Sequence, residues 1–137
     1  MTALHETTRR VEFRDTDAGG IMHFSAFFTY MEEAEHEYLR SRGLSVMMRD
    51  DEGPISWPRV SARCDYQSPV RFEDEVAIEV RPIRIGNKSM TYQFCFTHAG
   101  RAVATGEMTS VCCRLGADGR PRAIEIPDWI RQKLEPC

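Results

Sequence analysis

The apolar residues of the chain recur with two different periods, which separate one helical segment from several strands. In residues 6–14 polar positions alternate with Val11 and Phe13, and this alternation predicts a short first strand. From about residue 25 to residue 42 the apolar residues repeat at helical spacing, which predicts a long amphipathic helix that ends at Gly43. The apolar stripe of this helix comprises Phe24, Phe27, Phe28, Met31, Tyr38 and Leu39.

The second half of the chain contains four further alternating runs, each bounded by residues typical of turns. These predicted strands cover residues 55–68, 75–85, 88–98 and 101–115. Gly106 lies in the middle of the last run, and a glycine inside a strand often marks the close approach of another backbone. We therefore expect the long helix to cross the sheet at Gly106. Residues 127–134 predict a short terminal helix, and residues 44–50 fit a helical turn.

The order of these elements predicts an α+β architecture in which one long helix packs on an antiparallel sheet of about five strands. At roughly 100–200 residues per domain, residues 1–137 are expected to form one domain. Such a sheet keeps an exposed edge and a second face that needs cover. We therefore expect a homodimer formed by strand pairing, with further assembly to a homotetramer.

The charge balance narrows the classes of partner. The chain has 18 Lys and Arg against 21 Asp and Glu, a formal net charge of -3, whereas a nucleic-acid partner would require a basic patch. The apolar stretches are far shorter than the ~20 residues that span a bilayer. The N-terminal residues lack the apolar core of a signal peptide. We therefore expect a cytoplasmic protein without a membrane span.

The five cysteines show none of the spacings that hold a metal ion. Cys112 and Cys113 are adjacent, and neighbours on a strand point to opposite faces. We interpret Cys64, Cys95, Cys112 and Cys113 as small apolar residues in a reducing compartment, and Cys137 as a thiol at the chain end. No metal or cofactor is expected.

The richest candidate chemistry lies in residues 15–20 (DTDAGG), between the first strand and the long helix. Both Asp15 and Asp17 could cap the turn and the helix. Asp17, however, directly precedes two glycines and a helix N-terminus, whose free N–H groups attract negative charge. A carboxylate beside such donors is suited to acyl transfer, which requires a nucleophile or base and an oxyanion hole. The expected donors are the N–H groups around His23 and Phe24.

Two further residues of this region each allow two interpretations. His23 is a general acid or a thioester-orienting group, or equally a half-buried side chain at the start of the helix. Glu35 falls on the apolar face of the helix, where an unpaired charge is costly. It either lines a wet cavity or, as we favour, pairs with an arginine such as Arg63 or Arg71.

Two segments resemble hotdog-fold acyl-CoA thioesterases of the 4-hydroxybenzoyl-CoA thioesterase type, including their bacterial Tol-Pal-associated members. They are residues 11–44 (VEFRDTDAGGIMHFSAFFTYMEEAEHEYLRSRGL) and residues 65–80 (DYQSPVRFEDEVAIEV). The matching positions are Asp15, Asp17, Gly20, Phe27 or Phe28, Tyr30, Glu32, Pro69 and Asp74. The resemblance covers nearly the whole chain and is specific for the family, but not for a substrate.

The resemblance implies that Asp17 is the catalytic carboxylate, that the Phe24 N–H holds the oxyanion, and that a partner subunit completes the pocket. The sequence departs from the family in two places. Glu32 is followed three residues later by Glu35, where the family often has arginine. Residues 22–24 (MHF) stand where a Tyr, Trp or His pair is common, so the acyl preference does not carry over.

We therefore expect an acyl-CoA thioesterase that hydrolyses an acyl- or aroyl-CoA to the free acid and CoA, with Asp17 as nucleophile or general base. The expected substrate-binding residues are Gly20, Ile21, His23 and Arg59, and the CoA phosphates could meet Arg59, Arg84 or Lys88. Two alternatives remain at this level. One is a hotdog enoyl-CoA hydratase or dehydratase that uses His23 for proton transfer, and the other is a non-catalytic acyl-CoA-binding protein.

Overall fold

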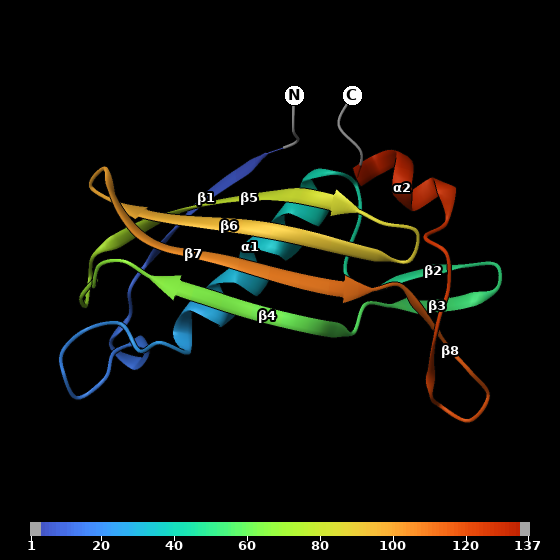
Figure 1. Ribbon diagram of the computed structural model, residues 1–137, viewed down its shortest axis with the longest axis horizontal. Coiled ribbons are helices and arrows are strands. Elements are labelled where there is room, and N and C mark those ends of the chain that lie inside the picture. The colour runs from blue at the N-terminus through green and yellow to red at the C-terminus, as the bar shows by residue number, and fades with distance from the viewer. Residues whose placement is uncertain (1–3, 135–137) are drawn as a thin grey trace.

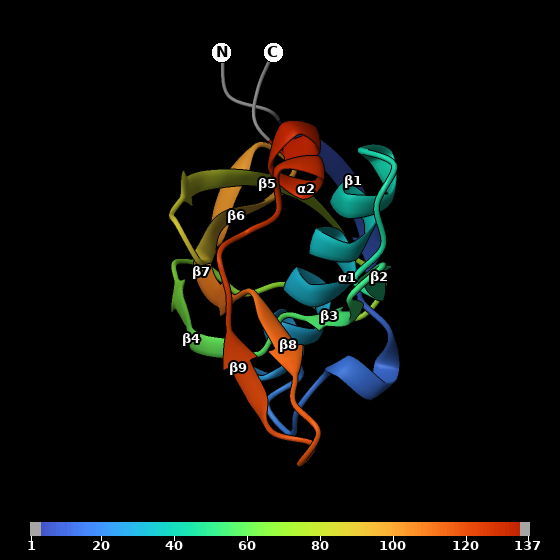
Figure 2. The same ribbon diagram turned by 90° about the vertical axis from the view of Figure 1, so that its right-hand side faces the viewer.

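The computed structural model describes residues 4–134 and consists of a sheet with a long helix across one face (Figure 1). The main sheet is antiparallel throughout and has the strand order β1-β5-β6-β7-β4. Its strands are β1 (His5–Arg10), β5 (Glu75–Ile85), β6 (Ser89–His98), β7 (Arg101–Val111) and β4 (Arg59–Tyr66). The helix is α1 (Ala26–Ser41), and Figure 2 shows it lying along the concave side of the sheet. The predicted hotdog architecture is confirmed.

The core lies between α1 and the sheet, because both elements turn an apolar face toward each other. In β5 every second residue from Val76 to Pro82 is buried, and β6 buries Met90, Tyr92, Phe94 and Phe96 on the same face, as the alternation predicts. The helix buries Phe27, Met31, Tyr38 and Leu39 of the predicted stripe. Phe24 is different, with 63% of its surface exposed, because it precedes the first helical residue and does not follow the helical spacing.

Gly106 of β7 lies under α1, where a side chain of the helix occupies the space that a Cβ atom would need. A Cβ atom at Gly106 would overlap the sulfur of Met31 in α1. The prediction that the helix crosses the sheet at this glycine is therefore confirmed.

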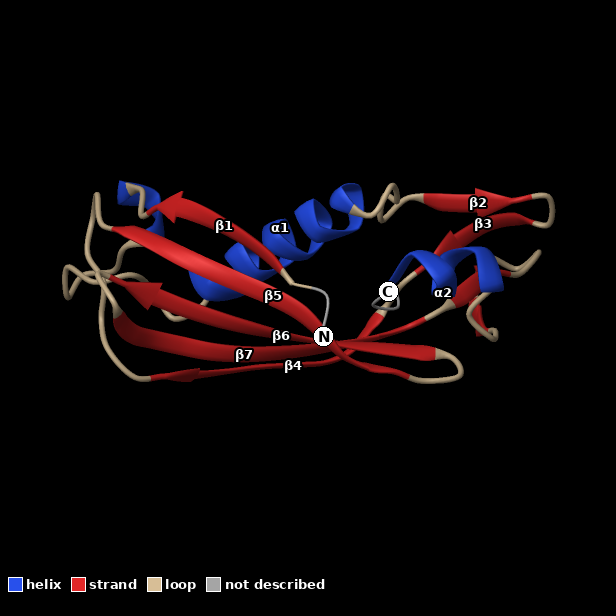
Figure 3. Cartoon of the chain, turned by 90° about the horizontal axis from the view of Figure 1, so that it is seen from above, coloured by secondary structure: helices blue, strands red, loops and turns tan. Residues whose placement is uncertain are grey.

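A second, smaller sheet lies at one end of the molecule, and the sequence analysis missed it (Figure 3). Its order is β2-β3-β8-β9. Its strands are β2 (Met48–Asp50), β3 (Gly53–Ser56), β8 (Cys113–Leu115) and β9 (Pro121–Ala123). The helical turn expected at residues 44–50 is thus wrong, since strand β2 begins there.

Three predicted strands are longer than the observed ones. Residues 55–68 divide at Trp57 and Pro58, because proline has no N–H to continue a ladder. Residues 101–115 divide at Cys112, whose N–H donates to the Lys88 carbonyl at 2.7 Å instead of to a neighbouring strand. The first strand ends at Arg10, and the 3₁₀-helix η1 (Phe13–Asp15) replaces the rest of residues 6–14.

The expected terminal helix is present as α2 (Asp128–Leu134), which packs at the C-terminal end of α1. Its Ile130 and Leu134 are buried, and the Tyr38 hydroxyl donates to the Leu134 carbonyl at 3.3 Å. The four cysteines within residues 4–134 are free thiols, and Cys137 lies outside the described residues. No helix in this part of the chain is long and apolar enough to cross a membrane.

Candidate active site

Asp15 has a structural role at the start of the connection between β1 and α1. Its Oδ2 atom accepts hydrogen bonds from the Glu12 N–H at 3.0 Å and from the Tyr30 hydroxyl at 2.6 Å. Burial and the neighbouring carboxylate of Asp15 raise the pKa of Tyr30 well above its usual range, so Tyr30 remains a donor. Asp15 therefore fastens η1 to α1, as expected for a capping residue.

Asp17 lies two residues further on, in a turn that holds its carboxylate at the surface of a pocket. Its Oδ1 atom accepts the Gly19 N–H at 2.8 Å, and the carbonyl of Asp17 accepts the Gly20 N–H at 3.0 Å. Gly20 has a φ of +79°, a left-handed conformation that glycine adopts without strain. The Asp17 N–H donates to the Ile21 carbonyl at 2.9 Å and closes the turn. Within the described residues, Asp17 makes no ion pair.

Among residues 22–26, which lead into α1, one main-chain N–H has no partner in the part of the chain that the structure describes. The Met22 N–H donates to the Val70 carbonyl at 2.8 Å, and the His23 N–H donates to the Asp15 carbonyl at 2.7 Å. The Ser25 N–H donates to the His23 ring at 3.1 Å, while Ala26 donates to the His23 carbonyl. The Phe24 N–H has no partner within residues 4–134. Of the two donors expected from the sequence, His23 is thus already bonded and Phe24 is available.

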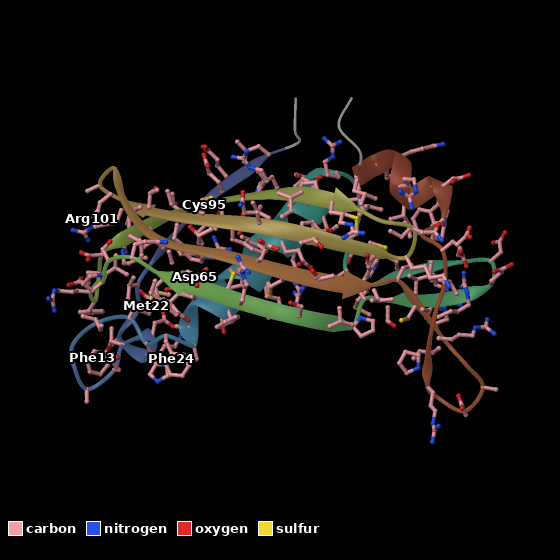
Figure 4. All side chains as sticks on the ribbon, viewed as in Figure 1. Phe13, Met22, Phe24, Asp65, Cys95 and Arg101 are labelled. Carbon is pink, nitrogen blue, oxygen red and sulfur yellow. The ribbon has the colours of Figure 1, made fainter. Side chains whose placement is uncertain are left out.

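A pocket of about 380 Å³ brings Asp17 and Phe24 together. Its wall comes from the Asp17 turn, the start of α1, and the end of β4 with the connection that follows it. The lining residues are Asp17, Ile21, Met22, Phe24, Phe27, Tyr66, Gln67, Ser68, Pro69 and Val70. Figure 4 shows Met22 and Phe24 at the same end of the molecule, away from the small sheet. The pocket is mainly apolar, with the Asp17 carboxylate as its single charged group among these lining residues.

Tyr66 is a pocket residue that the sequence analysis did not identify. Its ring meets Phe27 edge-on, with centroids 5.1 Å apart, and Phe27 in turn meets Phe96 of the core at 5.2 Å. The Tyr66 hydroxyl donates to the Phe24 carbonyl at 2.8 Å. The alternation in residues 55–68 could have placed Tyr66 on the helix-facing side, but only the folded chain shows which loop it meets.

The other expected substrate-binding residues are distributed differently. Ile21 lines the pocket, whereas Gly20, His23 and Arg59 are absent from its wall. The His23 ring stacks on the Phe24 ring at 4.6 Å, and its Nδ1 atom is 2.8 Å from the Ser25 hydroxyl. The hairpin between β5 and β6, with Lys88, lies at the opposite end of the sheet from the Asp17 turn (Figure 1).

Arg59 is held between the sheet and the helix. Its guanidinium donates to the Glu35 carboxylate at 2.9 Å and to Glu32 at 3.1 Å. Burial raises the pKa of Glu35 above its ordinary value of 4.5, although Arg59 opposes this shift. The expectation that Glu35 pairs with an arginine is confirmed, but the partner is Arg59 and not Arg63 or Arg71.

The chain is similar in sequence to known thioester hydrolases. The model of the thioesterase-like superfamily matches residues 11–134. A 1,4-dihydroxy-2-naphthoyl-CoA hydrolase of Synechococcus sp. (strain CC9605) is 30% identical over 95% of this chain and 89% of its own. The corresponding hydrolase of Prochlorococcus marinus (strain MIT 9313) is 33% identical over 93% and 87%.

A solved structure gives the same result. A gentisyl-coenzyme A thioesterase superposes with a TM-score of 0.80 at 26% identity, over 95% of this chain and 99% of that one. The family model spans far more than half of the chain, and its relatives and structural neighbours are named as CoA hydrolases and thioesterases. The chain therefore belongs to the thioesterase-like superfamily of hotdog proteins and is an acyl-CoA thioester hydrolase.

Proposed function

We propose that the protein hydrolyses an aromatic acyl-CoA, with the Asp17 carboxylate as the catalytic group and the Phe24 N–H as the oxyanion donor. The observation that carries this proposal is that Asp17 and Phe24 line the same pocket, and that the Phe24 N–H has no partner within residues 4–134. A group that attacks the carbonyl, or activates water to attack it, needs a donor nearby for the developing negative charge. The two residues supply these two functions.

The pocket supports an aromatic acyl group. Its volume of about 380 Å³ lies near the lower end of the range for small-molecule sites, which suits a compact ring better than a long chain. Phe24, Phe27 and Tyr66 provide aromatic walls, and aromatic pairs add to the free energy of binding beyond simple burial. The relatives named above act on naphthoyl and gentisyl thioesters, which are aromatic.

Asp17 can act on the thioester in two ways. As a nucleophile, one carboxylate oxygen bonds to the carbonyl carbon, and the carbonyl electron pair moves to the oxygen that accepts the Phe24 N–H. When the C–S bond breaks, CoA leaves as a thiolate that takes a proton from water, and water then hydrolyses the remaining mixed anhydride. As a general base, Asp17 instead removes a proton from a water molecule while that water attacks the carbonyl carbon. The C–S bond of the resulting intermediate then breaks, and the CoA thiolate leaves and takes up the proton that Asp17 had accepted.

The experiment follows the release of the CoA thiol from benzoyl-CoA, hexanoyl-CoA and palmitoyl-CoA. We expect the highest kcat/KM for benzoyl-CoA and a loss of at least about 100-fold in kcat for Asp17→Asn. Asp118→Asn, in the exposed hairpin of the small sheet, is the matched control. Full activity of Asp17→Asn would exclude the proposed role of Asp17, and equal rates on all three thioesters would exclude the aromatic preference.

The two roles of Asp17 are separated by a rapid quench of the wild-type reaction with benzoyl-CoA. A benzoyl group covalently bound to the Asp17 peptide, detected by mass spectrometry, identifies the nucleophile. In the general-base reaction this adduct is absent at every quench time.

We also propose that two copies assemble as a dimer through β4. This strand lies at the edge of the main sheet, and an unpaired edge readily accepts another strand. Val60 of β4 has 64% of its surface exposed, and Tyr66 at the end of the strand belongs to the pocket wall. Sedimentation should give a dimer or a tetramer built from it, and Val60→Glu should shift the population toward monomer. A monomeric wild-type protein at micromolar concentration would exclude this assembly.

A further inference from the structure

The side chain of Tyr66 connects the edge of the sheet to the residue that carries the oxyanion donor. Tyr66 is the last residue of β4, paired with Ala104 of β7, so its side chain points to the helix-facing side of the sheet. From there its hydroxyl reaches the Phe24 carbonyl at 2.8 Å. Its ring contacts Phe27, in the first turn of α1.

Phe24 depends on such main-chain contacts, because its own side chain does little to hold it. That side chain is 63% exposed, and within residues 4–134 its one contact with another ring is with its neighbour His23. The peptide group that contains the Phe24 N–H is held through its His23 carbonyl, which accepts the Ala26 N–H at 3.0 Å. On the other side of the Phe24 α-carbon, the carbonyl of Phe24 is held by Tyr66.

The Tyr66 hydroxyl can serve as this donor over the whole working range of an enzyme. Burial, together with the nearby Cys64 and Asp65, raises the pKa of Tyr66 to about 12. The hydroxyl therefore stays protonated at neutral and moderately alkaline pH. The bond to Phe24 does not require any other group to change its charge.

We propose that Tyr66 is a positioning residue for thioester hydrolysis, which fixes Phe24 so that its N–H points at the thioester oxygen in the transition state. This inference rests on the proposed role of the Phe24 N–H. An oxyanion donor is effective only if it is already aimed where the charge develops, because reorientation during the reaction would consume the stabilisation. Tyr66 acts through Phe24, because its hydroxyl donates a hydrogen bond to the carbonyl of the residue that carries the oxyanion donor.

The first test deletes only the hydroxyl. Tyr66→Phe keeps the ring against Phe27, so we expect benzoyl-CoA to bind with a KM within about twofold of the parent. We expect kcat to fall about tenfold, less than the loss of ~10²–10³ seen when an oxyanion donor is removed outright.

Tyr38→Phe is the matched control for this change. Its hydroxyl also donates to a main-chain carbonyl, that of Leu134, but at the far end of α1. We expect it to keep the parental kcat. If Tyr66→Phe also keeps the parental kcat, or raises KM alone, Tyr66 has no positioning role.

The second test observes the oxyanion donor directly, in the Asp17→Asn background, where benzoyl-CoA survives in the complex. Infrared difference spectra with a ¹³C-labelled carbonyl report the hydrogen bond that the thioester oxygen accepts. We expect the carbonyl stretch to move to lower frequency on binding, and we expect the addition of Tyr66→Phe to reverse part of this shift.

The outcomes distinguish a failure of the roles proposed for Asp17 and Phe24 from a failure of the role proposed for Tyr66. If Asp17→Asn still hydrolyses benzoyl-CoA at the parental rate, the proposed catalytic role of Asp17 fails, independently of Tyr66. If the carbonyl stretch does not move on binding, both the donor role of Phe24 and the inference on Tyr66 are overturned. If the shift is the same with and without Tyr66→Phe, the inference on Tyr66 alone is wrong.

Discussion

The Arg59 guanidinium lies 2.9 Å from the Glu35 carboxylate and joins β4 to the buried face of α1. A break in strand register between Arg59 and Ser61 is what makes this contact possible. Without the extra residue, Arg59 would point to the same side of the sheet as Ser61 and Arg63, away from the helix. The irregularity turns Arg59 inward, where it also lies 3.3 Å from the Ser110 hydroxyl.

Removal of Arg59 should destabilise the fold. Arg59→Met would leave the Glu35 carboxylate buried without its partner, and loss of one member of a buried pair costs about 3 kcal/mol. Urea denaturation measures the free energy of unfolding, with the exposed Arg84→Met as control. A loss of less than about 0.5 kcal/mol, the range of ordinary surface substitutions, would contradict a structural role for the pair.

The stability of the protein should also carry a pH dependence that originates at Glu35. Because burial raises its pKa above 4.5, the native state keeps a proton that the unfolded chain has already lost at mildly acidic pH. The contribution of Glu35 to the free energy of unfolding is thus full below pH 4.5, falls as the pH rises toward the raised pKa, and is constant above it. Arg59, His36 and Glu32 are the charged groups that influence this titration.

Glu35→Gln removes this titration and leaves the Arg59 contact largely intact. The difference in unfolding free energy, parent minus variant, should decrease as the pH rises from 4.5 to 7.5. Urea denaturation at three or four pH values measures it. A difference that stays constant or grows with pH would show that pairing with Arg59 outweighs burial at Glu35.

The crossing of helix and sheet at Gly106 should tolerate no side chain. Gly106→Ala places a methyl group against Met31, and such overpacking costs about 1–3 kcal/mol. Met31→Ala alone leaves a cavity and costs about 2–5 kcal/mol. The double variant should be more stable than the sum of the two losses predicts, because the cavity accepts the new methyl group. If the stability losses of the two single variants are strictly additive in the double variant, the methyl group at Gly106 does not clash with Met31.

The two aspartates of the active-site segment should separate stability from activity. Asp15→Ala removes the acceptor of the Tyr30 hydroxyl and of the Glu12 N–H, so we expect a loss of about 1–3 kcal/mol. Asp17→Asn retains an acceptor for Gly19 and should change the unfolding free energy by less than about 0.5 kcal/mol. Thermal denaturation of both variants measures the two losses of stability. A larger loss for Asp17→Asn than for Asp15→Ala would contradict this prediction.

The sequence allowed the main elements and the position of Asp17 to be predicted, because these depend on local periodicity and turn chemistry. The helix stripe, the crossing at Gly106 and the Asp17 turn all follow from neighbouring residues. Features that depend on the register between strands could not be predicted from neighbouring residues. The partner of Glu35 is set by one irregularity in β4.

The contact between Tyr66 and Phe24 could not be predicted from the sequence either, since it joins residues 42 positions apart in the chain. The small sheet escaped detection for a related reason. Its strands have only three or four residues each, too few for an alternation to be recognised.

The hydrogen bonds of the segment before α1 have a consequence for the exchange of its amide protons with solvent. Met22, His23, Ser25 and Ala26 each donate to a partner, so exchange of their protons requires the segment to open. Phe24, unbonded within the described residues, requires no such opening. In the free protein the Phe24 amide should exchange faster than these four amides, and a bound thioester should slow it selectively.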